Sequence, residues 1–157
     1  MQQALEKLIK QADNSPFYQL LDIKIEEVRR NYARLSIKID ERHIQLLNTV
    51  HGGVIASLAD SAAAWAIYGA NDLEGTPVTV EMKINFLRPV KSGRLVAEAR
   101  ICSKGSRIFV SDVEVKNSEG NLIAKSLVTY YLLKMGDEAK RAEIQLEDGN
   151  PTPNFFP

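Results

Sequence analysis

The chain has few of the features that single out a specialised class of protein. A single cysteine, Cys102, excludes an intramolecular disulfide, which rules out a secreted disulfide scaffold and indicates a reducing compartment. Cys102 itself is expected to be a small buried core residue. Twenty basic residues balance twenty acidic ones, so no overall charge attracts the protein to nucleic acid or to an anionic membrane.

Neither a signal peptide nor a membrane span is expected. Residues 1–21 carry apolar side chains at helical spacing with charges between them, which indicates a surface helix on a cytoplasmic protein. Residues 50–70 approach the length of a membrane span, but they contain Gly, Ser and Asp and have no flanking basic cluster. We therefore expect a core helix there.

Motifs for metal, nucleotide and serine-hydrolase chemistry are also missing. His43 and His51 have no second ligand at a metal-binding spacing. The sequence has no P-loop, no dinucleotide-binding glycine motif and no nucleophile elbow. It therefore predicts a site that needs no metal and no separate cofactor.

The hydrophobic periodicity predicts an α+β fold. Ser15 and Pro16 mark the start of a short second helix. Alternation predicts a strand over 32–40, a connection follows over 41–50, and 52–70 form a long apolar helix that ends near Gly69. Three short turns then separate four alternating segments, which predicts an antiparallel meander over 77–90, 93–104, 107–118 and 121–134. An almost uniformly apolar helix must be covered by a curved sheet.

These elements make a single domain over residues 1–134, with its N-terminal helices included. Residues 135–157 mix charge with Gly and Pro and are expected to form a C-terminal tail that can be flexible. Phe155 and Phe156 near its end are a candidate docking point.

Asp60 is the most unusual residue of the long helix. It is the only Asp, Glu, Lys or Arg between Arg42 and Asp72, and burying an unpaired carboxylate is costly. Two interpretations are open. Asp60 is either a structural residue that bonds a backbone or hydroxyl group, or a carboxylate kept for chemistry.

The segment His51-Gly52-Gly53 precedes Asp60 at the start of the same helix. Two glycines let a ligand approach bare backbone, and the first N–H groups of a helix have no intrahelical acceptor. Together with the helix dipole they can hold a polarised carbonyl oxygen. The alternative is that the three residues only form a tight turn.

Gly52 and Asp60 lie roughly 12 Å apart if they share one helix, at about 1.5 Å per residue, so they cannot both contact one reacting carbon. Two copies of the helix packed antiparallel about a two-fold axis would bring the helix start of one subunit to Asp60 of the other. The chemistry would then require a homodimer.

The segments NTVHGGVIASLADSAAAWA and TPVTVEMKINFLRP resemble the PaaI-type acyl-CoA thioesterases of the hotdog-fold superfamily, and the similarity extends over about residues 15–134. Its signature is His-Gly-Gly, an aspartate nine residues after the histidine, and the INFLRP strand. The resemblance implies an antiparallel sheet wrapped around a long helix, and a homodimer or a homotetramer built as a dimer of dimers. It also implies an acyl-CoA substrate whose coenzyme A binds at the subunit interface.

The resemblance also implies roles for individual residues. The Gly52 N–H, next to Gly53, would polarise the thioester carbonyl, and His51 would fix the turn. Asp60 of the opposite subunit would be the general base or the nucleophile, and Thr79 could position the water.

Other positions depart from the family or complete the coenzyme A site. Gln45 stands where the family commonly has asparagine, and Asn48 stands where it has glycine. Both remain candidate site residues, because Gln45 keeps the amide and Asn48 tolerates a left-handed backbone. Arginine and lysine suit phosphate contacts, and the candidates for these contacts are Arg88, Lys104, Ser106 and Arg107.

Two other functions are compatible with these residues. A non-catalytic acyl-CoA or fatty-acyl binding protein could use the same fold. A hydratase or dehydratase is less favoured, because His51 and Asp60 lie too far apart on one helix to act on one pair of carbons. Thioesters of acyl-carrier protein are alternative substrates, and the acyl group is not specified by the sequence.

Overall fold

The computed structural model describes residues 2–71 and 74–134. Three helical elements precede the central helix, and strands make up most of the rest. The elements in chain order are α1 (Gln2–Asp13), α2 (Pro16–Leu21), β1 (Ile23–Arg29), β2 (Tyr32–Lys38), the 3-10 turn η1 (Glu41–His43), α3 (Gly52–Ala70), β3 (Thr76–Phe86), β4 (Arg94–Lys104), β5 (Ile108–Asn117) and β6 (Leu122–Leu133). The predicted tail and its two phenylalanines lie outside the described residues.

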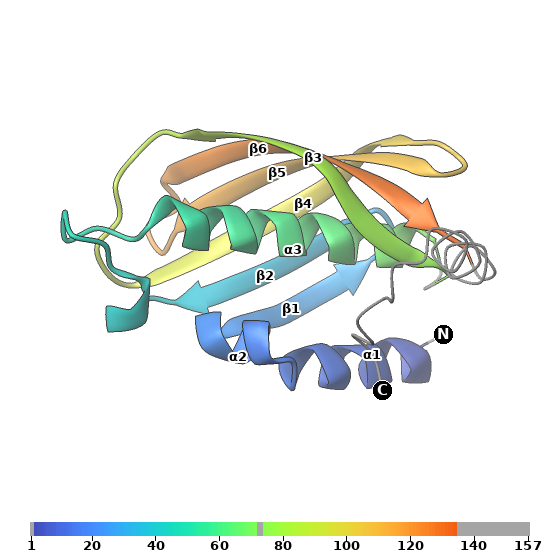
Figure 1. Ribbon diagram of the computed structural model, residues 1–157, viewed down its shortest axis with the longest axis horizontal. Coiled ribbons are helices and arrows are strands. Elements are labelled where there is room, and N and C mark those ends of the chain that lie inside the picture. The colour runs from blue at the N-terminus through green and yellow to red at the C-terminus, as the bar shows by residue number, and fades with distance from the viewer. Residues whose placement is uncertain (1, 72–73, 135–157) are drawn as a thin grey trace, which may run out of the picture.

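The described strands form one antiparallel sheet in the order β1-β2-β4-β5-β6-β3. Helix α3 lies across one face of this sheet, and α1 and α2 lie beside β1 at the lower side of the view in Figure 1. This arrangement confirms the predicted α+β fold, in which an antiparallel sheet packs around a long central helix.

The core lies between α3 and the inward face of the sheet. Strand β2 contributes Ala33, Leu35 and Ile37, which alternate with side chains on the outer face. Small residues let α3 approach the sheet closely. A Cβ on Gly69 would lie 2.3 Å from the Arg29 backbone oxygen, so this position has no room for a side chain.

Three sequence-based expectations were wrong. Strand β1 was not predicted, although it forms one edge of the sheet. The predicted four-strand meander holds only for β4, β5 and β6, because β3 pairs with β6 and not with β4. Cys102 is exposed and not buried, because it is the extra residue where the β4–β5 register shifts between Ile101 and Ser103.

Candidate active site

The start of α3 is held by the side chain of His51. His51 is the N-cap residue, with extended backbone angles (φ −64°, ψ 135°), and its Nδ1 accepts the Gly53 N–H at 2.8 Å. A Cβ on Gly53 would lie 2.9 Å from that nitrogen, so glycine keeps this contact possible. As the first helical residue, Gly52 has an N–H with no acceptor within the helix.

A loop closed by short hydrogen bonds leads into this helix start. Asn48 adopts the left-handed conformation (φ 57°) that the family's glycine would also allow. The Gln45 N–H donates to the Thr49 carbonyl at 2.8 Å, and Gln45 Nε2 donates to Thr49 Oγ1 at 3.0 Å. The loop that carries Gln45 is therefore fixed beside α3.

A cavity of about 370 Å³ opens next to Gly52. Arg88 lies on its wall, where Nη1 donates to the Leu122 carbonyl at 2.8 Å. The structure thus brings together three of the predicted site residues, and the complete lining is Gln45, Thr49, Val50, Gly52, Ile55, Phe86, Leu87, Arg88, Pro89 and Val90.

Asp60 lies two turns further along α3 and is half-buried. Thr79 Oγ1 donates to Oδ1 at 3.0 Å and lies 3.3 Å from Oδ2, and the Tyr130 hydroxyl lies 2.7 Å from Oδ1. Burial and the neighbouring Asp60 carboxylate raise the pKa of Tyr130, so its hydroxyl stays protonated and donates. Asp60 is therefore a carboxylate with two hydroxyl partners.

The remaining predicted phosphate contacts lie at the other end of α3. Lys104 Nζ donates to the Ala70 carbonyl, at the last residue of the helix, and the Arg107 guanidinium lies 5.6 Å from the centre of the Tyr131 ring. Ser106 is exposed in the turn between them. Since Gly52 and Ala70 are the first and last residues of α3, they lie about 27 Å apart at a rise of about 1.5 Å per residue. One chain therefore does not bring this group to Arg88.

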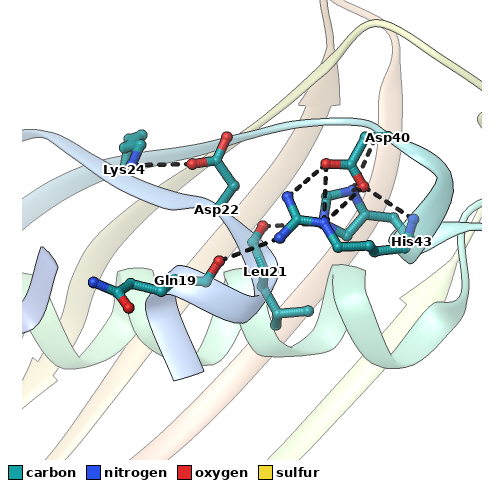
Figure 2. A network of polar contacts seen from close by, with 7 residues as sticks. Gln19, Leu21, Asp22, Lys24, Asp40 and His43 are labelled. Carbon is teal, nitrogen blue, oxygen red and sulfur yellow. Dashed lines mark hydrogen bonds and ion pairs between the residues drawn. The ribbon is translucent and has the colours of Figure 1, made fainter. Parts of the chain in front are cut away.

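His43 has a structural position away from both groups. Its side chain is fully buried, with Nδ1 accepting the Asp40 N–H at 3.0 Å and Nε2 lying 3.1 Å from the Leu21 carbonyl. Figure 2 shows these contacts beside the Asp40 carboxylate, and the contact between His43 Nε2 and the Leu21 carbonyl joins η1 to the end of α2. Over residues 2–71 and 74–134, no three His, Cys, Asp or Glu side chains are grouped to hold a metal ion.

One residue beside Asp60 was not identified from the sequence. Tyr130 lies in the alternating segment LVTYYLL, where the period-two pattern places it on the inward face with Val128 and Leu132. That pattern predicts a core side chain. It carries no sign that the hydroxyl reaches the carboxylate on α3.

The chain is similar to known proteins over most of its length. A model of the thioesterase superfamily matches residues 47–124, which contain the helix start, Asp60 and Thr79. The protein SSO2140 of Saccharolobus solfataricus, provisionally classed as an esterase, is 33% identical over 137 residues that cover 87% of this chain and 96% of SSO2140. The chain belongs to the thioesterase superfamily.

Two further proteins are similar to this chain. Acyl-coenzyme A thioesterase 13 of Mus musculus is 34% identical over 99 residues, which cover 61% of this chain and 69% of the mouse protein. The crystal structure of thioesterase HI1161 from Haemophilus influenzae superposes with a TM-score of 0.77 at 27% identity, covering 84% of this chain and 92% of HI1161. These findings confirm both the hotdog fold and the family resemblance. Among the described helices, none combines the length and hydrophobicity of a membrane span.

Proposed function

We propose that this chain is an acyl-CoA thioesterase whose active site forms between two copies of the protein. The observation that carries the proposal is the division of the site along α3. The cavity beside Gly52 lies at the helix start, whereas the hydroxyl-bonded Asp60 lies about 12 Å away on the same helix. Gly52 and Asp60 of one copy are therefore too far apart to act on the same carbon. A second copy packed antiparallel would bring its Asp60 next to the cavity beside Gly52.

The thioester carbonyl oxygen would accept the Gly52 N–H at the helix start. A water oxygen would then bond to the carbonyl carbon as its proton passes to Asp60 of the second copy. When the C–S bond breaks, coenzyme A leaves as a thiolate, and the proton held by Asp60 returns to the sulfur or the solvent. If Asp60 instead attacks the carbonyl carbon, the C–S bond breaks, coenzyme A leaves as a thiolate and a mixed anhydride of Asp60 and the acyl group forms. Water then hydrolyses this anhydride, which releases the acid and restores the Asp60 carboxylate.

Two surfaces of the described chain support dimer formation. One side of α3 stays partly exposed where small residues flank the carboxylate, at Ala56, Asp60 and Ala64. Strand β3 pairs only with β6 among the described strands, and Val78 and Val80 on it are 38% and 62% exposed. An unpaired apolar strand is a ready site for antiparallel pairing with another copy.

Antiparallel packing of two α3 helices would also bring Lys104 and Arg107 of one copy closer to Arg88 of the other. The C-terminal end of one helix, with Lys104, Ser106 and Arg107, would approach the cavity of the other, with Arg88. These side chains could then contact the phosphates of one coenzyme A molecule. Gln45 and Asn48 would shape the cavity wall and the loop that leads to it.

A second function is favoured by one observation. The carboxylate of Asp60 accepts hydrogen bonds from two hydroxyl groups, as a purely structural aspartate would. In that case the protein would bind acyl-CoA without hydrolysing it. Hydrolysis and binding are separated by one assay.

That assay follows free thiol with a colour-forming reagent over a panel of short, medium, long and aryl acyl-CoA substrates. We expect turnover by the wild type and a loss of about 100-fold or more in kcat for Asp60→Asn, because the amide cannot accept the proton. Asp112→Asn is the control, since Asp112 pairs with Lys125 on the sheet and lies outside the proposed site.

Two outcomes would contradict the proposal. Normal turnover by Asp60→Asn would remove Asp60 from the reaction. Tight acyl-CoA binding with no thiol release by the wild type would favour the binding protein.

A further inference from the structure

Tyr130 and Thr79 reach Asp60 from neighbouring strands. The two residues face each other in the β3–β6 ladder, and both side chains point to α3. Tyr130 is only 2% exposed. Its hydroxyl also lies 2.7 Å from the backbone carbonyl oxygen of Asp60. The one hydrogen of this phenol can point to only one of the two oxygens at a time, and the ionised carboxylate is the stronger acceptor.

The two carboxylate oxygens of Asp60 differ in their hydrogen-bond contacts. Oδ1 lies 2.7 Å from Tyr130 and 3.0 Å from Thr79, whereas the contact of Oδ2 with Thr79 is longer, at 3.3 Å. No other hydrogen bond to Oδ2 comes from the described part of the chain. Oδ1 is therefore held, and Oδ2 retains acceptor capacity.

A β-bulge gives Thr79 its place in this arrangement. The register of β3 against β6 shifts between Thr79 and Glu81, so Val80 is an extra residue on the edge strand. Bulges of this kind redirect the neighbouring side chain and are frequent beside active sites. Here the bulge lies at the residue that contacts the carboxylate.

We propose that Tyr130 is a positioning residue, which fixes the Asp60 side chain through Oδ1 and leaves Oδ2 as the oxygen that receives the proton. The inference rests on the proposed thioesterase function and adds to it the orientation of the base. Tyr130 itself would not contact the substrate, because it is buried beneath Asp60. Its hydroxyl acts by restricting the carboxylate to one rotamer.

The test compares Tyr130→Phe with a matched control. Tyr32→Phe also removes the hydroxyl of a buried tyrosine that donates to a carboxylate, at 2.7 Å from Glu98 Oε1. Tyr32 lies on β2, however, and its hydroxyl contacts Glu98 and not Asp60. We expect Tyr130→Phe to lower kcat about 10- to 100-fold with KM within about twofold, because a misplaced base slows the step without weakening binding. Tyr32→Phe should keep the wild-type kcat.

A double variant separates positioning from general damage. If Tyr130 acts through Asp60, adding Tyr130→Phe to Asp60→Asn lowers kcat no further. An unchanged kcat in Tyr130→Phe, or losses that multiply in the double variant, would overturn the inference. Thermal melting of both Tyr→Phe variants checks that the fold is retained.

A second measurement does not depend on activity. A phenol proton held by a carboxylate should give a slowly exchanging, downfield proton resonance in the NMR spectrum. We expect this resonance to vanish in Tyr130→Phe, to shift in Asp60→Asn and to persist in Tyr32→Phe. Its absence from the wild type would overturn the Tyr130–Asp60 contact. A wild type that shows the resonance but releases no thiol would instead overturn the proposed function, and with it the assignment of Oδ2 as the proton acceptor.

Discussion

The Asp60 carboxylate and the Gly52 N–H are single groups whose neighbours determine what they can do. The hydroxyls of Thr79 and Tyr130 satisfy the carboxylate without a positive charge. A lysine or arginine partner would stabilise the ionised form more strongly and would make the carboxylate a weaker proton acceptor. The Gly52 N–H is left without an intrahelical acceptor by its place in the helix. In the proposed mechanism, the carboxylate would therefore act with neutral hydrogen-bond donors as its only described side-chain partners.

At Gly69 the neighbouring backbone determines which side chain the position can hold. Exchanging a helical glycine for alanine usually stabilises by about 0.5–1 kcal/mol, but here the new Cβ would lie 2.3 Å from the Arg29 oxygen. We expect Gly69→Ala to lower the free energy of unfolding by about 1–3 kcal/mol, because the backbone of β1 must move. Urea denaturation measures this change.

Gly52→Ala is the comparison for Gly69→Ala. Its Cβ would lie 3.2 Å from Cζ of the Phe86 ring, the far end of a side chain that can rotate. Its free energy of unfolding should stay within about 1 kcal/mol of the wild type. A stabilised Gly69→Ala would show that α3 and β1 are less tightly packed than the structure indicates.

Among the elements, the turn η1 depends on a charge. Asp40 caps it by accepting the Arg42 N–H at 3.0 Å, and the hydrogen bonds from the Arg42 side chain lower the pKa of Asp40 from 3.8 to about 2. A carboxylate whose pKa is lowered by folding stabilises the folded protein. This stabilisation is fully present when the pH is above the pKa in the unfolded state, and it is lost as the pH falls through the pKa in the folded state. The relevant window is therefore about pH 4 to pH 2.

We expect Asp40→Asn to lose less thermal stability than the wild type between pH 5 and pH 2. Asparagine keeps the capping oxygen but removes the titrating group. Circular dichroism melts across this pH range give the difference in Tm between the two proteins at each pH. A constant difference at every pH would show that the Asp40–Arg42 pair contributes nothing to stability.

The sequence predicted the elements better than their pairing. The long helix, β2 and the inward alternation of β4 to β6 followed from local periodicity. Strand β1 was missed because its pattern is interrupted where the register shifts between Ile25 and Glu27. The position of β3 beside β6 could not be predicted from turn length, because that contact is made with residues far along the chain.

Residues of the candidate site could likewise be predicted only where the local sequence or the family resemblance marks them. His51, Gly52 and Asp60 were identified because glycines at a helix start and a lone charge in an apolar helix are local signals. Thr79 came from the family resemblance. Tyr130 carries neither signal, since its hydroxyl matters only through a contact between β6 and α3.

At the scale of the whole molecule, the proposed shared site can be tested by complementation. Gly52→Pro removes the N–H but suits the first helical position, and the extended His51 backbone (ψ 135°) suits a residue before proline. This variant and Asp60→Asn should each be inactive alone. Refolded together in equal amounts, they should regain about a quarter of the wild-type activity, because half of the dimers are mixed and each has one intact site.

The same experiment distinguishes a site within one chain. If Gly52 and Asp60 of one copy acted together, every mixed dimer would contain two defective sites and no activity would return. Size-exclusion chromatography of each variant provides the control, since both must still form dimers for the comparison to hold.

The order of the strands also has a consequence for synthesis of the chain. Strand β3 is made directly after α3, but its partner β6 is the last described strand, with β4 and β5 made between them. A nascent chain therefore carries the exposed valines of β3 with both strand edges unpaired until β6 has left the ribosome. Unpaired apolar strands promote aggregation during folding. Truncation before Leu122 should thus yield insoluble protein, although α3 and most of the sheet would already have been made.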